Sequence, residues 1–207
     1  MRDCVFCNII KTGDNNKEEK NIILYEDDLI LITQATGSPV RGYLMIVPKK
    51  HINGFAELSK KELENVENII NRIKFIYKKH FNINSILLEH GSIEEGRHPQ
   101  SIVHAHLHLI PFNFTREIED ELISVLQLKQ MEYFEDIKTN QKLDYWLYCS
   151  PKGKFYKSAN ILSVPRSIFM NLIAKQIGMS LPYEWRNSKT KDEYIIEIID
   201  IFKNNKI

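Results

Sequence analysis

The sequence predicts an α+β fold, in which an antiparallel sheet is interrupted by one long amphipathic helix. Three observations support this fold class. Short β-branched or leucine-rich segments bounded by turn residues dominate the chain before Ser59, a helical repeat of apolar residues follows Ser59, and helical segments prevail after Pro111. Such segregation of strands and helices is typical of α+β proteins. We expect a first domain over residues 1–114 and a C-terminal extension over residues 115–207, a mixed set of helices and one hairpin packed on that domain.

The strands of the first domain are expected on both sides of the helix. Asn21–Leu24 and Leu29–Thr33 flank three acidic residues and predict a hairpin. Tyr43–Val47 predicts a third strand that stops at Pro48, because proline has no amide hydrogen for a central ladder. Two further strands are expected after the helix, over Ile83–Glu89 and Ser101–Ile110.

The long helix is expected from about Ser59 to Lys79. Ser59-x-x-Glu62 has the capping-box pattern, in which each side chain bonds to the backbone amide of the other residue. Apolar residues then recur at intervals of three and four, which places them on one face of a helix. They are Leu63, Val66, Ile69, Ile70, Ile73 and Ile76.

The extension carries its own start and turn signals. Thr115 can cap a helix, and Thr190-x-x-Glu193 repeats the capping-box pattern before a last helix. Pro165 fits the first position of a helix between them. The hairpin is expected from two strands and a proline-glycine turn: Tyr145–Cys149, Lys154–Tyr156 and Ser150–Gly153.

Three histidines alternate with aliphatic residues in one of the expected strands. Because successive side chains of a strand point to opposite faces, His104, His106 and His108 share one face. A solvent-facing strand would explain one such histidine, but three of the chain's 7 in alternation favour a functional site. In a straight strand the first and third are about 13 Å apart, too far to bind one metal. A row of neutral imidazoles can instead combine nucleophilic attack with hydrogen bonding to phosphate oxygens.

Cys4-x-x-Cys7 has three interpretations: half of a zinc site, a redox pair, or two small buried residues. A disulfide framework is excluded because the chain has only 3 cysteines. A redox pair is disfavoured because the two residues do not follow a strand that enters a helix. Zinc requires two more nitrogen or sulfur ligands, for which His51 and His104 are our candidates.

Several blocks of the sequence resemble the histidine triad (HIT) family. His104–Ile110 alternates histidine with hydrophobic residues and ends in two hydrophobics, as the family motif does. The resemblance implies a HIT-like sheet in which His106 is the nucleophile that attacks the α-phosphate of a nucleotide. It also implies that His108, Gln100 and Ser101 hydrogen-bond the transferred group. Further blocks occur in family order and spacing within residues 1–114: Cys4–Ile10, Leu24–Asp28, Gly42–Ile52 and Gln100-Ser101.

The resemblance also implies a metal. Zinc-bearing triad proteins and the distantly similar galactose-1-phosphate uridylyltransferases use two cysteines, the histidine after a Pro-Lys-x block and the first histidine of the active-site strand. In this chain the corresponding residues are Cys4, Cys7, His51 and His104. The zinc would be structural and would hold His106 in place from two residues away.

Two departures from the family pattern concern the nucleotide. Tyr43 follows Gly42 where the family usually has histidine, and the segment Thr33–Ser38 lacks the acidic residue that binds the ribose hydroxyls. His90 and His98 are candidates for contacts to the phosphate or the leaving group, with a structural role and a surface position as the alternatives. Five cations of the extension could hold phosphates beside aromatic rings, although a solvated surface explains them more simply: Lys152, Lys154, Lys157, Arg166 and Arg186.

These features predict a hydrolase or nucleotidyltransferase that acts through a covalent nucleotidyl-His106 intermediate. Its substrate would be a nucleoside phosphoramidate, a dinucleoside polyphosphate or a nucleotidylated compound. The alternative is a catalytically silent, zinc-stabilised protein that binds nucleotides or serves as a scaffold. Small triad proteins commonly form homodimers through the long helix and a sheet edge, a surface that the extension could cover here.

Composition excludes several other classes. The chain has 28 basic and 27 acidic side chains, which provides no electrostatic case for duplex nucleic acid or an anionic membrane. No segment has the length and apolarity of a membrane span, and the N-terminus lacks the apolar core of a signal peptide. We therefore expect a cytoplasmic protein.

Overall fold

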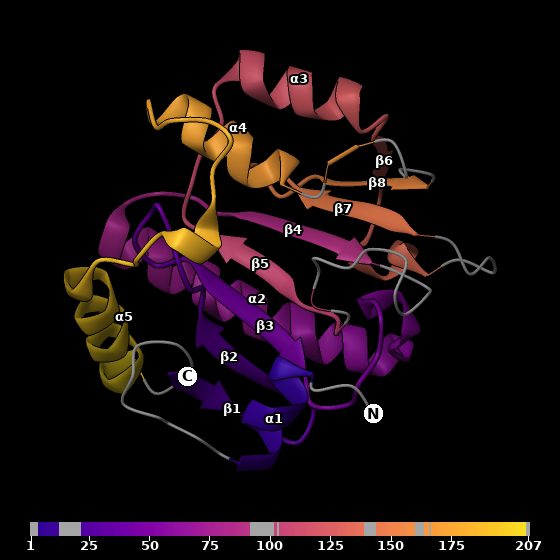
Figure 1. The fold of residues 1–207 in the computed structure, drawn as a ribbon. Coiled ribbons are helices and arrows are strands. Elements are labelled where there is room, and N and C mark those ends of the chain that lie inside the picture. The colour runs from indigo at the N-terminus through magenta and orange to yellow at the C-terminus, as the bar shows by residue number, and fades with distance from the viewer. Residues whose placement is uncertain are drawn as a thin grey trace.

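The computed structural model describes residues 4–12, 22–91, 102, 104–138, 144–159, 164–165 and 167–205. These residues form an 8-stranded antiparallel sheet with the order β1-β2-β3-β5-β4-β7-β8-β6 (Figure 1). The predicted α+β class is therefore confirmed. The strands are β1 (Ile23–Glu26), β2 (Ile30–Gln34), β3 (Leu44–Pro48), β4 (Ile86–Gly91), β5 (Leu107–Ile110), β6 (Lys129–Met131), β7 (Tyr145–Cys149) and β8 (Phe155–Ala159).

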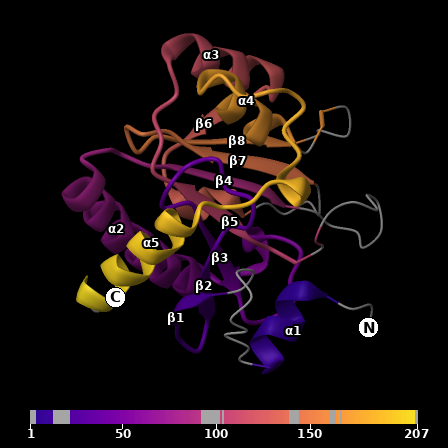
Figure 2. The ribbon, with the colours of Figure 1, turned by 60° about the vertical axis from the view of Figure 1, so that its left-hand side comes forward.

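Helices cover both faces of the sheet (Figures 1 and 2). The first face packs against α2 (Lys60–Phe81) and α5 (Asp192–Asn205). The second face packs against α1 (Val5–Thr12), α3 (Arg116–Val125) and α4 (Ile168–Gln176). Three short 3-10 helices complete the fold: η1 (Phe55–Glu57), η2 (Phe134–Ile137) and η3 (Trp185–Asn187). None of the helices in the described ranges is long and apolar enough to cross a membrane.

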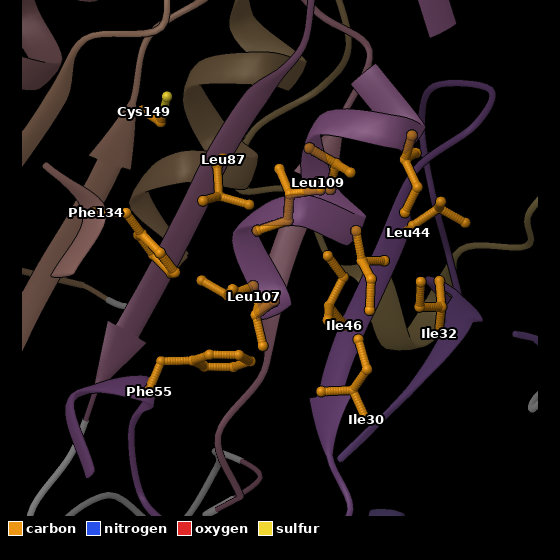
Figure 3. Close-up of a cluster of buried hydrophobic side chains, with 14 of the residues drawn as sticks. Ile30, Ile32, Leu44, Ile46, Phe55, Leu87, Leu107, Leu109, Phe134 and Cys149 are labelled. Carbon is orange, nitrogen blue, oxygen red and sulfur yellow. The ribbon is translucent and has the colours of Figure 1, made fainter. Parts of the chain in front are cut away.

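The core beneath α2 is built from alternate residues of neighbouring strands (Figure 3). Leu107 and Leu109 point to this face together with Ile46 and Leu87, and all four are fully buried. Burying a side chain of this size contributes roughly 1.5–3 kcal/mol. Since residues of a strand alternate between faces, His108 of β5 must point to the opposite face.

Strands from residues 115–207, the predicted extension, continue the sheet formed by residues 1–114. β7 pairs antiparallel with β4, from Leu87 opposite Cys149 to Gly91 opposite Tyr145. The β7–β8 turn has the expected form, because the amide of Gly153 donates to the carbonyl of Ser150 at 2.9 Å. The edge that β4 would otherwise leave open is therefore occupied by the chain's own next strand.

Residues near the start of α5 hold the connection between β2 and β3. The hydroxyl of Tyr183 donates to the carbonyl of Gly37 at 2.5 Å. The hydroxyl of Thr190 accepts from the amide of Ser38 at 2.9 Å and donates to the carbonyl of Ala35 at 3.2 Å. Gly37 has φ +65, and a Cβ on it would lie 2.1 Å from the carbonyl oxygen of Trp185. This close contact requires glycine.

Most sequence-predicted elements are confirmed with shifts of one to three residues. The capping box of Ser59 and Glu62 has both of its hydrogen bonds, and Thr115 accepts from the amide of Ile118 to cap α3. The capping box at Thr190 is wrong, because its hydroxyl bonds to the β2–β3 connection instead. The helix expected from Pro165 begins at Ile168, whose amide donates to the carbonyl of Pro165.

The predicted strand over Ser101–Ile110 is wrong in its first half, since β5 begins only at Leu107. Ser101 lies outside the described residues. The amide of Ala105 donates to the carbonyl of Ile52 at 2.7 Å and does not join the β3–β5 ladder. The carbonyl of Pro48, which a longer ladder would use, accepts instead from the ring of His104 at 2.8 Å.

Candidate functional site

The structure brings together the four residues that the sequence predicts as metal ligands. Cys4 and Cys7 lie at the start of α1, His51 follows β3, and His104 precedes β5. One ligand atom of each residue lies within 4.8 Å of the others. The Cys7 Sγ to His51 Nδ1 distance is 3.1 Å, and the His104 Nδ1 atom is 3.4 Å from Cys4 Sγ and 3.5 Å from Cys7 Sγ.

These distances fit a tetrahedral ion. Bonds of about 2.3 Å to sulfur and about 2.0 Å to nitrogen place adjacent sulfur and nitrogen ligands roughly 3.5 Å apart. Burial and the adjacent Cys4 thiol raise the pKa of Cys7 to about 11. A cation between the sulfurs reverses this effect, since a coordinating thiol is deprotonated. Two cysteines and two histidines close the coordination shell of a structural site.

His104 also has the outer hydrogen bond that metal-binding histidines usually make. Its Nε2–H donates to the carbonyl of Pro48 at 2.8 Å, which leaves the Nδ1 lone pair for the metal. The ring is buried, and burial lowers the pKa of His104, which keeps the imidazole neutral. The hydrogen bond to Pro48 thus fixes the His104 tautomer that a metal ligand requires.

His106 is oriented by the backbone of the same ligand. Its Nδ1 atom lies 2.7 Å from the carbonyl oxygen of His104, so Nδ1 carries the proton and the lone pair is on Nε2. Phe6 of α1 packs against both rings, with centroid distances of 5.4 Å to His106 and 5.6 Å to His104. The helix that begins with the two cysteines therefore supports His106 from the side.

His108 lies beside His106 on the second face of the sheet. The two ring centroids are 4.8 Å apart at an interplanar angle of 75°. The hydroxyl of Tyr43 is 2.7 Å from His108 Nδ1. Burial, with a smaller contribution from His106, lowers the pKa of His108 well below its ordinary range. His108 is therefore a neutral imidazole near pH 7.

The remaining candidates are placed differently. His90 lies on β4, and its ring centroid is 4.3 Å from that of Trp146. Leu88 is opposite His108, so alternation along β4 puts His90 on the same face as the triad. Three other candidates lie outside the described residues: His98, Gln100 and Ser101.

The cations of the extension do not gather at the triad. Lys152 and Lys154 are exposed around the β7–β8 turn, which follows Cys149 at the far end of β7 from His90. Lys157 reaches the carbonyl of Ile137, and Arg186 packs over its neighbour Trp185 at 4.5 Å. Arg166 lies outside the described residues. The described cations thus form a scattered set and no phosphate cradle.

A buried carboxyl group anchors the segment that follows His51. Glu89 accepts hydrogen bonds from the amide of Phe55 at 2.9 Å and from the hydroxyl of Tyr145 at 2.5 Å. The same hydroxyl accepts from the amide of Ala56 at 3.2 Å. Burial raises the pKa of Glu89 to about 7 despite these bonds. The chain between a metal ligand and η1 is thereby tied to β4 and β7.

Two contacts of the site were not anticipated from the sequence. Phe6 supports the histidine rings, and its position between two cysteine ligands is the signal that could have identified it. Tyr43 was noted only as a departure from the family pattern. Met45 is opposite His108, and Tyr43 lies on the same face two residues earlier, so the contact could be identified only from the register of β3 and β5.

Sequence comparison assigns the family. Residues 3–124, more than half of the chain, match the family model described as scavenger mRNA decapping enzyme C-term binding. The chain belongs to that family, within the HIT-like superfamily. An uncharacterised HIT-like protein of Methanocaldococcus jannaschii is 27% identical over 136 residues, which is 65% of this chain and 96% of the relative. Another from Borreliella burgdorferi is 30% identical over 115 residues, or 54% of this chain and 76% of the relative.

Solved HIT structures are similar to part or nearly all of the chain. A hypothetical histidine triad nucleotide-binding protein from Sulfolobus tokodaii has 16% identity and a TM-score of 0.49, covering 98% of this chain and 91% of that one. A Zn-bound histidine triad family protein from Mycobacterium smegmatis has 21% identity and a TM-score of 0.42, covering 56% and 78%. The family assignment of this HIT protein rests on the sequence match.

We expect the HIT protein to bind one divalent metal ion per chain at the Cys4, Cys7, His51 and His104 cluster. Cys7→Ser should abolish stoichiometric binding and lower the melting temperature, because closed metal sites contribute to the free energy of folding. Titration with Co²⁺, whose thiolate charge-transfer absorption reports sulfur ligation, measures binding. Cys149→Ala is the matched control, since the Cys149 sulfur contacts Lys74 and the Ser150 carbonyl instead. Metal-free wild type with unchanged melting would contradict the assignment.

A second expectation concerns Glu89. The Glu89 carboxyl releases its proton near pH 4.5 in the unfolded chain and near pH 7 in the folded protein. The stability from this group is therefore complete below pH 4.5 and is lost as the pH rises through about 7. Glu89→Gln cannot ionise, so wild type should lose up to about 3 kcal/mol relative to the variant over this window.

Urea unfolding between about pH 5 and 8 measures the difference. The pH profile of the unfolding free energy is measured for wild type and for Glu89→Gln. Their difference excludes the titration of Cys4, Cys7, His51 and His104, which both proteins share. Glu64→Gln, an exposed change on α2, should leave the profile of wild type unaltered. Parallel profiles for wild type and Glu89→Gln would show that the buried carboxyl does not titrate in this range.

Proposed function

We propose that the protein is a nucleotide hydrolase or nucleotidyltransferase that works through a covalent nucleotidyl-His106 intermediate. The observation that carries this proposal is the hydrogen bond from His106 Nδ1 to the carbonyl of His104. This bond fixes the imidazole with its lone pair on Nε2, the form that can attack phosphorus. The neighbouring His108 ring, 4.8 Å away, supplies a neutral imidazole to the same place.

The reaction consists of two displacements at phosphorus. The Nε2 lone pair of His106 attacks the α-phosphorus, and the bond to the bridging oxygen or nitrogen breaks with its electron pair. The leaving group takes up a proton from solvent. Water, or another nucleophile in a transfer reaction, then attacks the same phosphorus, and the electron pair of the N–P bond returns to Nε2. The attacking group loses its proton to solvent.

Positioned donors are expected to stabilise the charge that develops on the phosphoryl oxygens. His108 is the described candidate, and Gln100 and Ser101 are proposed for the same role because of their place in the family motif. His90 and His98 remain proposed contacts to the phosphate or leaving group. Fixed donors of this kind need no reorganisation as the transition state forms.

We propose zinc as the metal of the Cys4, Cys7, His51 and His104 site. Two thiolates and two imidazoles are the donor set of closed zinc sites. Bound zinc would supply structural cross-linking of α1, the β3 end and the β5 start. The metal-ligand residue His104 would then hold the His106 nucleophile through its own carbonyl oxygen.

A nucleotide is the proposed small-molecule partner. The matching family is described by an mRNA-decapping enzyme, which favours a substrate with a nucleotide joined through phosphate. We therefore propose nucleoside phosphoramidates and dinucleoside polyphosphates as the substrate classes. A homodimer would require a surface other than the β4 edge, since β7 occupies it.

The decisive experiment traps the adduct. The protein is mixed with labelled adenosine 5′-phosphoramidate, diadenosine tetraphosphate or an mRNA cap dinucleotide, and peptides are searched for nucleotidyl-histidine by mass spectrometry. A catalytically silent zinc-stabilised scaffold, the alternative function, would bind a nucleotide and yield no adduct with any of the three.

We expect His106→Asn to abolish the adduct and leave folding and nucleotide binding intact. The asparagine amide keeps hydrogen-bonding capacity, but its nitrogen has no lone pair for attack on phosphorus. His108→Ala should slow single-turnover nucleotidylation by about 100- to 1000-fold, the typical cost of losing one donor to a developing oxyanion. Labelling by each variant is compared with wild type at matched folded concentrations.

His80→Asn is the control for a histidine-to-asparagine change. His80 lies at the C-terminal end of α2, where its ring contacts Asn205. This variant should label at the wild-type rate. If His106→Asn accumulates labelled protein as fast as wild type, then His106 is not the nucleophile.

A further inference from the structure

Tyr43 places a buried hydroxyl beside Nδ1 of the His108 ring. The residue is 4% exposed and directly precedes β3. Its oxygen is 2.7 Å from His108 Nδ1 and 3.4 Å from the sulfur of Met170 in α4. The rings of Tyr43 and His108 meet edge to face, with centroids 5.7 Å apart. A hydroxyl in this position controls which nitrogen of His108 carries the proton.

The hydroxyl has one proton and two acceptors within reach. A thioether sulfur is a weak acceptor, whereas the lone pair of a neutral imidazole is a strong one. Burial raises the pKa of Tyr43 above its ordinary range, so the hydroxyl keeps its proton. The hydroxyl therefore donates its hydrogen bond to His108 Nδ1. The single proton of the neutral imidazole must then reside on Nε2.

We infer that Tyr43 is a positioning residue that holds His108 as a neutral hydrogen-bond donor with its proton on Nε2. This inference rests on the proposed function, in which His108 donates to the transferred phosphoryl group. His106 and His108 then have opposite tautomers. The Nδ1–H of His106 donates to the carbonyl of His104, whereas Nδ1 of His108 accepts from the hydroxyl of Tyr43.

The opposite tautomers suit the two tasks of the site. His106 presents a lone pair at Nε2 for attack, and His108 presents an N–H at Nε2 for the oxygen that gains charge. If both rings had the same tautomer, one of these tasks would be lost. The extension contributes as well, because Met170 of α4 packs against the hydroxyl that sets the arrangement.

The tautomer can be measured without turnover. In protein labelled with ¹⁵N-histidine, the His108 signals, assigned by their loss in His108→Ala, should show a protonated Nε2 and an unprotonated Nδ1. Tyr43→Phe should convert these signals to those of a mixture of tautomers. A wild-type spectrum with the proton on Nδ1 would overturn the inference, because the hydroxyl would then be an acceptor.

Kinetics test whether Tyr43 acts through His108. With adenosine 5′-phosphoramidate as the probe, Tyr43→Phe should lower kcat on the order of 10- to 100-fold with little change in KM, as when a functional histidine loses its hydrogen-bond partner. The double variant with His108→Ala should be no slower than His108→Ala alone, because interacting residues are not additive. Independent losses that multiply in the double variant would overturn the inference.

Tyr148→Phe is the matched control. Tyr148 is fully buried in the core on the same face, and its hydroxyl donates to Glu119 at 2.6 Å. This variant should keep the wild-type kcat and the His108 spectrum. If wild type forms no nucleotidyl adduct with any of the three probes, the proposed function fails. The ¹⁵N spectrum then still decides whether Tyr43 fixes the tautomer.

Discussion

The site depends on the interactions of one residue, His104. Its Nδ1 atom meets two cysteine sulfurs, its Nε2–H donates to the carbonyl of Pro48, and its own carbonyl accepts from His106. The next amide, that of Ala105, bonds to Ile52. Three segments distant in sequence, at residues 4–7, 48–52 and 104–106, are thereby joined. If the cluster holds the proposed zinc, the gain can be large, since structural zinc contributes roughly 10–16 kcal/mol in zinc-finger peptides, which is comparable with the whole stability of a typical domain.

In this arrangement the candidate metal ligands do not include His106, yet His104 hydrogen-bonds to it. The ligand atoms belong to the rings of His51 and His104, whereas the contact with His106 is made by a backbone carbonyl. A shift of the His104 ring would move that carbonyl and with it the hydrogen bond that sets the His106 tautomer. A metal held by this cluster would therefore govern the orientation of His106, the proposed nucleophile, without contacting the substrate. Phe6 adds a second connection, since it lies in the helix that carries Cys7 and packs on the rings of His104 and His106.

The features that could be predicted from the sequence are those that short-range rules determine. The helix after Ser59 follows from a capping box and an apolar repeat, and the β7–β8 turn follows from Pro151 and Gly153. The four candidate metal ligands, which the structure brings together, could be chosen because their residue types and the family blocks agree. The late start of β5 could not be predicted, because the ring of His104 bonds to the carbonyl of Pro48, which lies 56 positions away in the sequence. The role of Thr190 was missed for the same reason, since its partners lie in the β2–β3 connection.

The segment that lacks the family's ribose-binding acid contacts residues of the extension. The resemblance places that acid within the segment Thr33–Ser38, yet backbone groups of this segment already bond to the extension through Tyr183 and Thr190. Gly37 approaches Trp185 so closely that no side chain fits there. On the same face of the sheet, Met170 of α4 contacts the tyrosine that replaces the usual histidine. Both departures from the family pattern therefore lie where the extension touches the first domain. Residues 115–207 therefore contact both segments, through Tyr183 and Thr190 in one case and Met170 in the other.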